Sequence, residues 1–64
     1  MAETQPAIMR YFEYAHLPEH LQAISLKFHA LATDLIDRTN AGPEQTAGLR
    51  KLLEAKDCFV RAAL

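Results

Sequence analysis

Six apolar residues in the middle of this chain recur at alternating steps of four and three, and this seam restricts the possible folds more than any other feature. They are Leu17, Leu21, Ile24, Phe28, Leu31 and Leu35. Such spacing is typical of a helix that packs against a nearly antiparallel neighbour. It predicts a long helix over residues 18–39, about 33 Å in length for a rise of about 1.5 Å per residue.

The residues after this seam predict a helical hairpin. Asn40-Ala41-Gly42-Pro43 combines residues that tolerate a left-handed backbone with a proline suited to the first turn of the next helix. That helix is predicted over residues 43–63. The helical period places on one apolar arc Leu49, Leu52, Leu53, Phe59, Val60 and Ala63.

A shorter helix is predicted before the hairpin, over residues 6–16. Thr4 is the expected N-cap, Pro6 suits the first turn, and Pro18 disfavours helical geometry at Leu17. The helical period places on one face Ile8, Tyr11, Phe12 and Ala15. The predicted fold is all-α: one domain over residues 1–64, in which a short N-terminal helix precedes a long antiparallel helical hairpin.

The chain has little room for a core of its own. A domain of 64 residues buries only about 60% of the surface that its unfolded form exposes. Cys58 is the only cysteine, so no internal disulfide compensates. Leu26 lies opposite the seam with Ala23 and Ala30 beside it, which makes the long helix apolar on two sides. We therefore expect a homo-oligomer, with a lone exposed leucine as the alternative for Leu26.

Composition and motifs exclude several classes of function. A formal charge of -1 provides no excess of positive charge for binding long nucleic acid or an acidic membrane surface. No apolar stretch is long enough to span a bilayer. The start of the chain has no leader pattern, so we expect a cytosolic protein. Pro18 interrupts the spacing of His16 and His20, and no phosphate loop or nucleophile motif occurs. We expect no enzyme, no metal and no cofactor.

Lys56 falls near the middle of the apolar arc of the last helix, between Leu52 and Leu53 on one side and Phe59 and Val60 on the other. An ammonium group there loses hydration unless it finds a partner. One interpretation is that the stem packs and the amine reaches solvent or a carboxylate such as Asp34 or Asp37. The other is a cation at a subunit interface or in a ligand pocket.

Aromatic residues cluster in the first helix. Tyr11, Phe12 and Tyr14 lie within four residues of one another beside Arg10. Rings of this size suit an oligomer interface or a platform on which bases stack. In the first case Phe12 belongs to the core and the tyrosines line a subunit contact.

Three segments of the chain resemble a phage family. They are YFEYAHLPEHLQAIS (Tyr11 to Ser25), FHALA (Phe28 to Ala32) and LRKLLEAKDCFVRAAL (Leu49 to Leu64). The family comprises the anti-CBASS sponges, small helical proteins that bind the cyclic oligonucleotide messengers of bacterial immunity. Their hairpin domain is shared with Thoeris-inhibiting sponges for cyclic ADP-ribose derivatives. The resemblance implies a homohexamer in the cytoplasm of the infected bacterial host, which sequesters cyclic di- and trinucleotides, or cyclic ADP-ribose isomers, without cleaving them.

The resemblance also implies two sets of binding residues. Tyr11 matches a tyrosine that stacks on a base of a cyclic dinucleotide. The family has a lysine directly after the serine of the long helix, whereas here Ser25 is followed by Leu26, and Lys27 comes one position later. Arg50 matches an arginine of the trinucleotide pocket, and Lys51 and Arg61 flank it on the same helix. The alternative function is a structural or adaptor hairpin that oligomerises or binds a protein partner.

Overall fold

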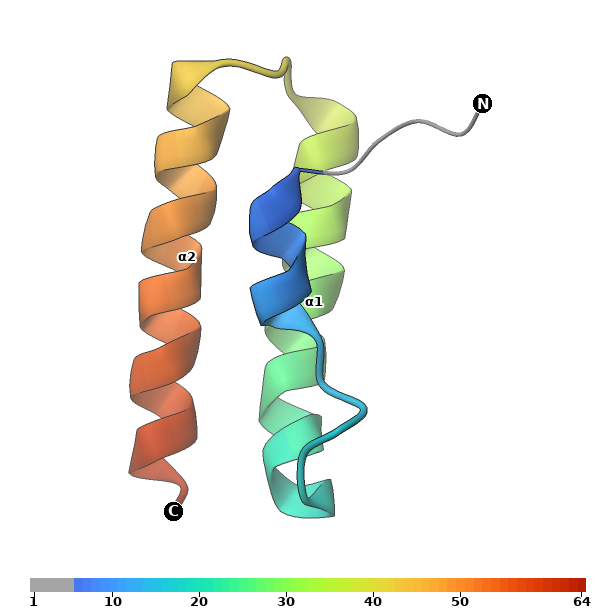
Figure 1. The fold of residues 1–64 in the computed structure, drawn as a ribbon, viewed down its shortest axis with the longest axis vertical. Helices are drawn as coiled ribbons and strands as arrows, with labels where there is room; N and C mark the ends of the chain where they lie inside the picture. Colours follow the sequence, from blue (N-terminus) through green and yellow to red (C-terminus); the bar gives the residue numbers. More distant parts are fainter. Residues whose placement is uncertain (1–5) are drawn as a thin grey trace.

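The computed structural model describes residues 6–64, which form three helices and no strand. A 3₁₀ helix, η1, spans Ala7–Phe12, and two α-helices follow, α1 over Glu19–Arg38 and α2 over Pro43–Ala62. The two long helices form an antiparallel hairpin, and η1 lies along the same hairpin beside α1 (Figure 1). The all-α fold and both long helices are therefore confirmed, with each helix end within one residue of its predicted position. Thr4, the expected N-cap of the first helix, lies outside the described residues.

The predicted first helix is too long and has the wrong period. Residues 6–16 were expected to form one helix, but η1 ends at Phe12, and Glu13 has an extended backbone with φ -63° and ψ 147°. A 3₁₀ helix has about three residues per turn, so side chains three apart lie in line. Met9 and Phe12 are accordingly the buried pair, while Tyr11 and Ala15 are exposed. The predicted inner face is therefore right for Phe12, which is buried in the core, and for Ile8, which packs against it, and wrong for Tyr11 and Ala15.

The buried stripe of α1 differs from the predicted seam by one residue at three positions. Leu21 and Phe28 face inward as expected, but the other inward side chains are those that directly follow the seam residues Ile24, Leu31 and Leu35. They are Ser25, Ala32 and Ile36. Leu31 and Leu35 are instead exposed. The seam pattern describes two helices alone, whereas α1 also packs against η1, which turns the small residues Ser25 and Ala32 inward.

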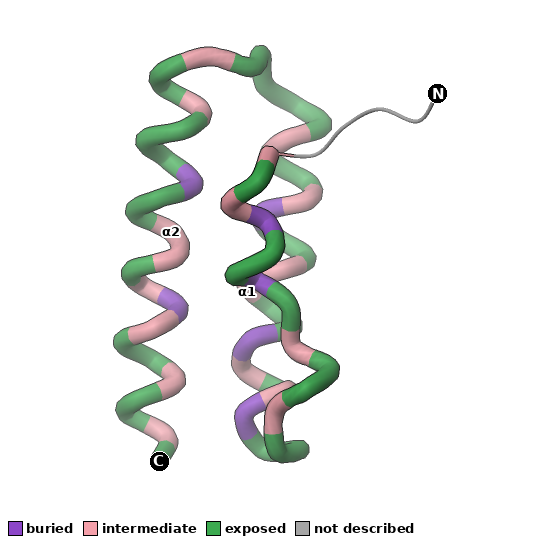
Figure 2. Tube along the Cα trace, viewed as in Figure 1, coloured by how far each residue is buried: buried purple, intermediate pink, exposed green. Residues whose placement is uncertain are grey.

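The core forms where the three helices meet. Met9 and Phe12 from η1 pack with Ala32 from α1 and Leu49 from α2, and all four are buried. Around them lie the half-buried side chains of Ile8, Phe28, Ile36, Leu52 and Leu53. The buried residues all lie on the inner sides of the three elements (Figure 2). Because the side chain of Ala32 is small, the fully buried ring of Phe12 fits against α1 at this point.

Side-chain hydrogen bonds stabilise both connections between the helices. At the hairpin turn, Thr39 Oγ1 donates to the carbonyl of Leu35 at 2.7 Å and accepts from Gln45 Nε2 at 3.0 Å. Gly42, the residue before α2, has φ 156° and ψ -175°, a conformation essentially confined to glycine. In the connection between η1 and α1, the side-chain amide of Gln22 donates to the carbonyls of Ala15 and Leu17, at 3.3 and 2.8 Å. The segment between η1 and α1 is thereby held to α1.

Candidate functional site

Tyr11 lies at the end of η1 and presents its ring to solvent. The residue is 58% exposed, although its neighbour Phe12 is completely buried. The guanidinium carbon of Arg10 lies 5.6 Å from the centre of the Tyr11 ring, within the range of a cation–π contact. The chain therefore carries an exposed aromatic face next to a cation on a short, anchored helix. Arg10 was not among the predicted binding residues; its position beside Tyr11 in the sequence was the available signal.

The backbone of Tyr11 is held by Lys56 of α2. Lys56 Nζ donates a hydrogen bond to the Tyr11 carbonyl oxygen at 2.6 Å, and Asp57 Oδ1 lies 3.7 Å from the same nitrogen. Lys56 is only 9% exposed, so its predicted place inside the apolar arc is confirmed. Neither predicted carboxylate partner is found: Asp34 pairs with Arg38 at 2.9 Å, and Asp37 makes no ion pair among the described residues. The lysine instead satisfies a carbonyl at the end of η1, where intrahelical donors run out.

The predicted dinucleotide residues of α1 do not join Tyr11 within one chain. Leu26 is 45% exposed, and Lys27 is exposed as well. Both lie away from the stripe that packs against η1 and α2. Across residues 6–64 no hydrogen bond or ion pair links either of them to Tyr11. Such a set can enclose a ligand only if a second subunit contributes part of it.

Arg50 and Lys51 lie together at an open surface cavity of about 540 Å³ at the start of α2. Pro43, Thr46, Ala47 and Glu54 complete its lining. Two cations and one hydroxyl provide donors for an anion, while the carboxylate of Glu54 opposes it. Arg61 does not belong to this cavity, because it follows Arg50 by eleven positions, about 16 Å along the helix. Its guanidinium contacts Cys58 Sγ at 3.4 Å instead.

Of the other predicted contact residues, Phe12 is buried and Tyr14 is half-buried. Phe12 is part of the core of the single chain. Tyr14 packs edge to face against His29 of α1, with ring centres 5.4 Å apart and planes at 70°. The two rings share a small surface cavity with Glu13, Ala15 and His16. Within the described part of the chain, no three His, Cys, Asp or Glu side chains gather closely enough to hold a metal ion.

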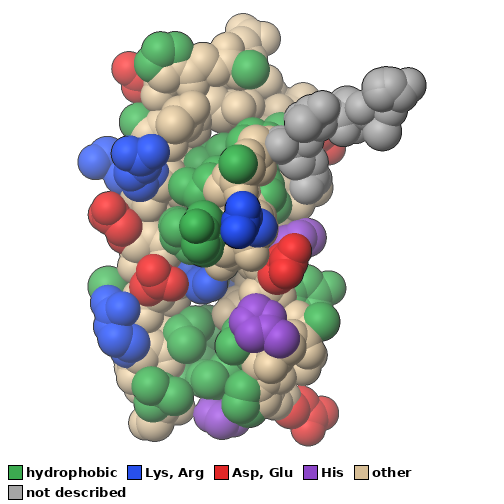
Figure 3. All heavy atoms as spheres, viewed as in Figure 1, with side chains coloured by type: hydrophobic (Ala, Val, Ile, Leu, Met, Phe, Trp, Pro, Cys, Tyr) green, Lys and Arg blue, Asp and Glu red, His purple; other side chains and the backbone are tan. Residues whose placement is uncertain are grey.

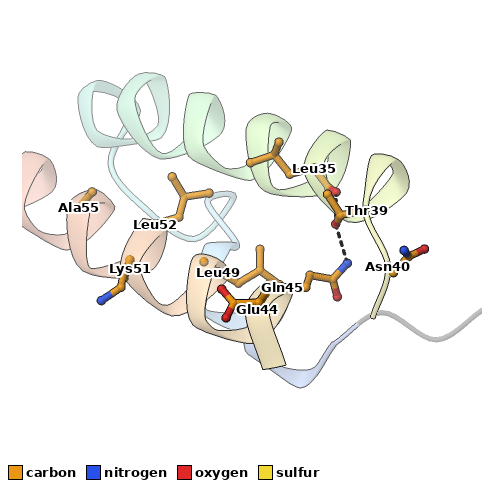
Figure 4. A pocket seen from close by; sticks show the side chains of 10 residues that line it. Leu35, Thr39, Asn40, Glu44, Gln45, Leu49, Lys51, Leu52 and Ala55 are labelled. Carbon is orange, nitrogen blue, oxygen red and sulfur yellow. Dashed lines mark hydrogen bonds between the residues drawn. The ribbon is translucent and has the colours of Figure 1, made fainter. Parts of the chain in front are cut away.

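An apolar groove with a volume of about 640 Å³ lies between α1 and α2. Leu35, Leu49, Leu52 and Ala55 line its floor, and none of its lining residues comes from η1. Figure 4 shows Leu35 of α1 converging with Leu49 and Leu52 of α2, while the amine of Lys51 lies at the edge. The spacing of apolar residues did not predict this groove, because it placed Leu35 in the buried seam, whereas Leu35 is exposed.

Charged side chains are interspersed on the outer side of α2 rather than gathered in one patch, and apolar side chains cover the space between η1 and α2 (Figure 3). Phe59 adds a further exposed ring, 59% accessible, stacked on Phe28 with centres 5.9 Å apart.

No helix within residues 6–64 has both the length and the apolar character required to cross a membrane. No known protein family, curated protein or solved structure gives a significant match to this chain.

Proposed function

We propose that this chain is a phage anti-defence protein that binds cyclic oligonucleotide second messengers and sequesters them without cleaving them. The observation that carries the proposal is the exposed Tyr11 ring on an anchored backbone, in a sequence that resembles the anti-CBASS sponges. Stacking of one base on such a ring contributes about 1–3 kcal/mol. A second messenger with two or three bases offers this ring a flat partner, and its phosphates require few cations.

The cavity at Arg50 and Lys51 supports a second ligand class. A guanidinium binds phosphate through paired, charge-assisted hydrogen bonds, and Thr46 adds a hydroxyl at the same cavity. We assign cyclic trinucleotides to this cavity and cyclic dinucleotides to Tyr11. Leu26 and Lys27 of a neighbouring subunit would complete the dinucleotide site. Arg61 remains a flanking cation outside the cavity.

Assembly is part of the proposal. The groove lined by Leu35, Leu49, Leu52 and Ala55 leaves apolar surface uncovered in the single chain. Leu26 lies on the opposite side of α1 from Leu35, nine positions away, so the chain has two apolar sides. A closed homohexamer requires contacts on more than one side of each subunit. We propose that these two faces provide them and that the ligands bind between subunits.

Thermal unfolding in the presence of ligands tests this function directly. Cyclic dinucleotides, cyclic trinucleotides and cyclic ADP-ribose isomers are compared with linear dinucleotides of the same bases. A ligand at one hundred times its Kd adds about 2.7 kcal/mol to the free energy of unfolding. Tyr11→Ala should remove the shift from cyclic dinucleotides, and Arg50→Ala the shift from cyclic trinucleotides. Recovery of intact ligand after digestion of the protein, followed by chromatography, tests sequestration without cleavage.

The apolar groove itself favours a second candidate function, a structural or adaptor hairpin that binds a protein partner. This alternative predicts no stabilisation by any of the cyclic nucleotides. It also predicts that the Tyr11→Ala and Arg50→Ala variants unfold at the same temperature with and without each ligand. Absence of every ligand shift would refute the sponge and leave the adaptor.

A further inference from the structure

Lys56 is the one charged residue within residues 6–64 that is buried, and the binding sets assigned above do not use it. Its stem lies in the apolar arc of α2, and its ammonium group ends at the carbonyl of Tyr11. Asp57, the carboxylate near this nitrogen, is 3.7 Å away and half exposed, so the pair is a loose one. The short hydrogen bond is therefore made to the backbone of η1 and not to a buried counter-ion.

Packing alone gives no reason for a lysine at this position. An apolar side chain of similar volume would fill the same arc without removing a charge from water. What only the ammonium group provides is a donor for the Tyr11 carbonyl. Among the described residues, this is the only side-chain hydrogen bond that a long helix makes to η1.

The hydrogen bond fixes the residue whose ring is exposed. Phe12, directly after Tyr11, anchors η1 through its buried side chain, and Lys56 holds the peptide group between these two residues. The backbone of Tyr11 is thus restrained at its carbonyl end, while its ring projects into solvent beside Arg10. A ring on a restrained backbone loses less conformational entropy when a base stacks on it.

We propose that Lys56 is a positioning residue for Tyr11, which sets the affinity for cyclic dinucleotides through the backbone of η1 without touching the ligand. This inference rests on the proposed function. It requires that the effect of Lys56 on binding pass through the Tyr11 ring. Removal of the ring should therefore abolish the effect of Lys56.

A double-mutant cycle measures this dependence. Cyclic di-AMP and cyclic GMP-AMP are titrated calorimetrically into the wild type, Lys56→Met, Tyr11→Ala and the double variant. We expect Tyr11→Ala to weaken binding about 5-fold to 150-fold. Lys56→Met should weaken it by at least about twofold in the Tyr11 background. In the Tyr11→Ala background, Lys56→Met should cause no further loss.

Three controls separate positioning from general damage. Arg38→Met removes an equally charged but exposed side chain outside both binding sets, and should leave affinity unchanged. Lys56→Arg keeps a donor and should restore part of the lost affinity. Binding of a cyclic trinucleotide, which depends on Arg50, should be the same for Lys56→Met and the wild type.

The possible outcomes are distinct. Additive losses in the cycle, or an equal loss of cyclic trinucleotide binding, would overturn the positioning role while leaving the proposed function intact. Failure of the wild type to bind any cyclic dinucleotide would refute the proposed function at Tyr11 and this inference with it. Should Lys56→Met not fold, the cycle is repeated with Lys56→Gln, whose shorter side chain keeps a polar end. Loss of helical structure in that variant too would make Lys56 a purely structural residue and overturn the inference.

Discussion

The ammonium nitrogen of Lys56 lies 2.6 Å from the carbonyl oxygen of Tyr11, and this hydrogen bond joins residues 45 positions apart. It ties α2 to the C-terminal end of η1, a helix of six residues that is too short to be stable by itself. The bond therefore connects Lys56, the buried charged residue of the described chain, to the backbone of Tyr11, whose ring is exposed. Its removal should have a local effect on η1 that exceeds its effect on the hairpin.

Lys56→Met tests that local effect. The loss of a charge-assisted hydrogen bond is partly offset because no ammonium group has to be buried, so we expect the free energy of unfolding to fall by about 1 kcal/mol. Hydrogen exchange at the amides of η1 should accelerate more than exchange in the middle of α1 and α2. Exchange followed by mass spectrometry measures both. Equal acceleration in all three helices would contradict a local tether.

The two glycines should respond oppositely to the same change. Gly42→Ala forces a side chain onto φ 156° and should lower the free energy of unfolding by about 1–3 kcal/mol. Gly48 lies inside α2 with open space where a Cβ atom would be, so Gly48→Ala should raise it by about 0.5–1 kcal/mol. Urea denaturation followed by circular dichroism gives both values. Gly48 also lines the apolar groove, so a destabilising Gly48→Ala would indicate that another molecule fills this space.

Phe12 and Tyr11 are neighbours with opposite burial, and their truncation should separate packing from surface exposure. Phe12→Ala empties the centre of the core and should lower the free energy of unfolding by about 3–5 kcal/mol, enough to unfold much of a chain this small. Tyr11→Ala should lower it by less than about 1 kcal/mol, because the ring is largely in solvent. Thermal unfolding without ligand compares the two variants. Similar losses would show that the Tyr11 ring is covered in solution.

Ser25 is fully buried, and within residues 6–64 its hydroxyl has no hydrogen-bond partner. Burying such a group costs about 1–3 kcal/mol relative to a satisfied one. Ser25→Ala removes the oxygen while creating little empty space, so we expect the free energy of unfolding to rise by about 1 kcal/mol. Thermal or urea denaturation of the isolated protein checks the sign. A loss of stability would mean that the hydroxyl is satisfied in the assembled protein.

The two exposed leucines on opposite sides of α1 test assembly. Leu35→Glu places a charge at the apolar groove, and Leu26→Glu places one on the other side. Each should reduce the mass measured by light scattering toward that of the 7.2 kDa chain, with little change in helical content. A wild-type mass equal to one chain at micromolar concentration would contradict the proposed oligomer.

The sequence by itself determined the hairpin and the position of its buried cation. Regular spacing of apolar residues and the prolines at positions 18 and 43 define both long helices within one residue of their ends. The same arithmetic placed Lys56 within the apolar arc of α2, because helical geometry fixes side-chain direction wherever the helix is regular. Exposure of Leu26 likewise follows from its place opposite the seam.

Other features depend on tertiary contacts and cannot be predicted from the spacing of apolar residues. The choice between an α-helix and a 3₁₀ helix over residues 7–12 depends on how Met9 and Phe12 meet α1 and α2, since so short a segment has no strong preference of its own. Packing of η1 against α1 also turned Ser25 and Ala32 inward and left Leu31 and Leu35 outside. The partner of Lys56 is a backbone carbonyl, and every residue has one. Only the docking of η1 against α2 selects the carbonyl of Tyr11.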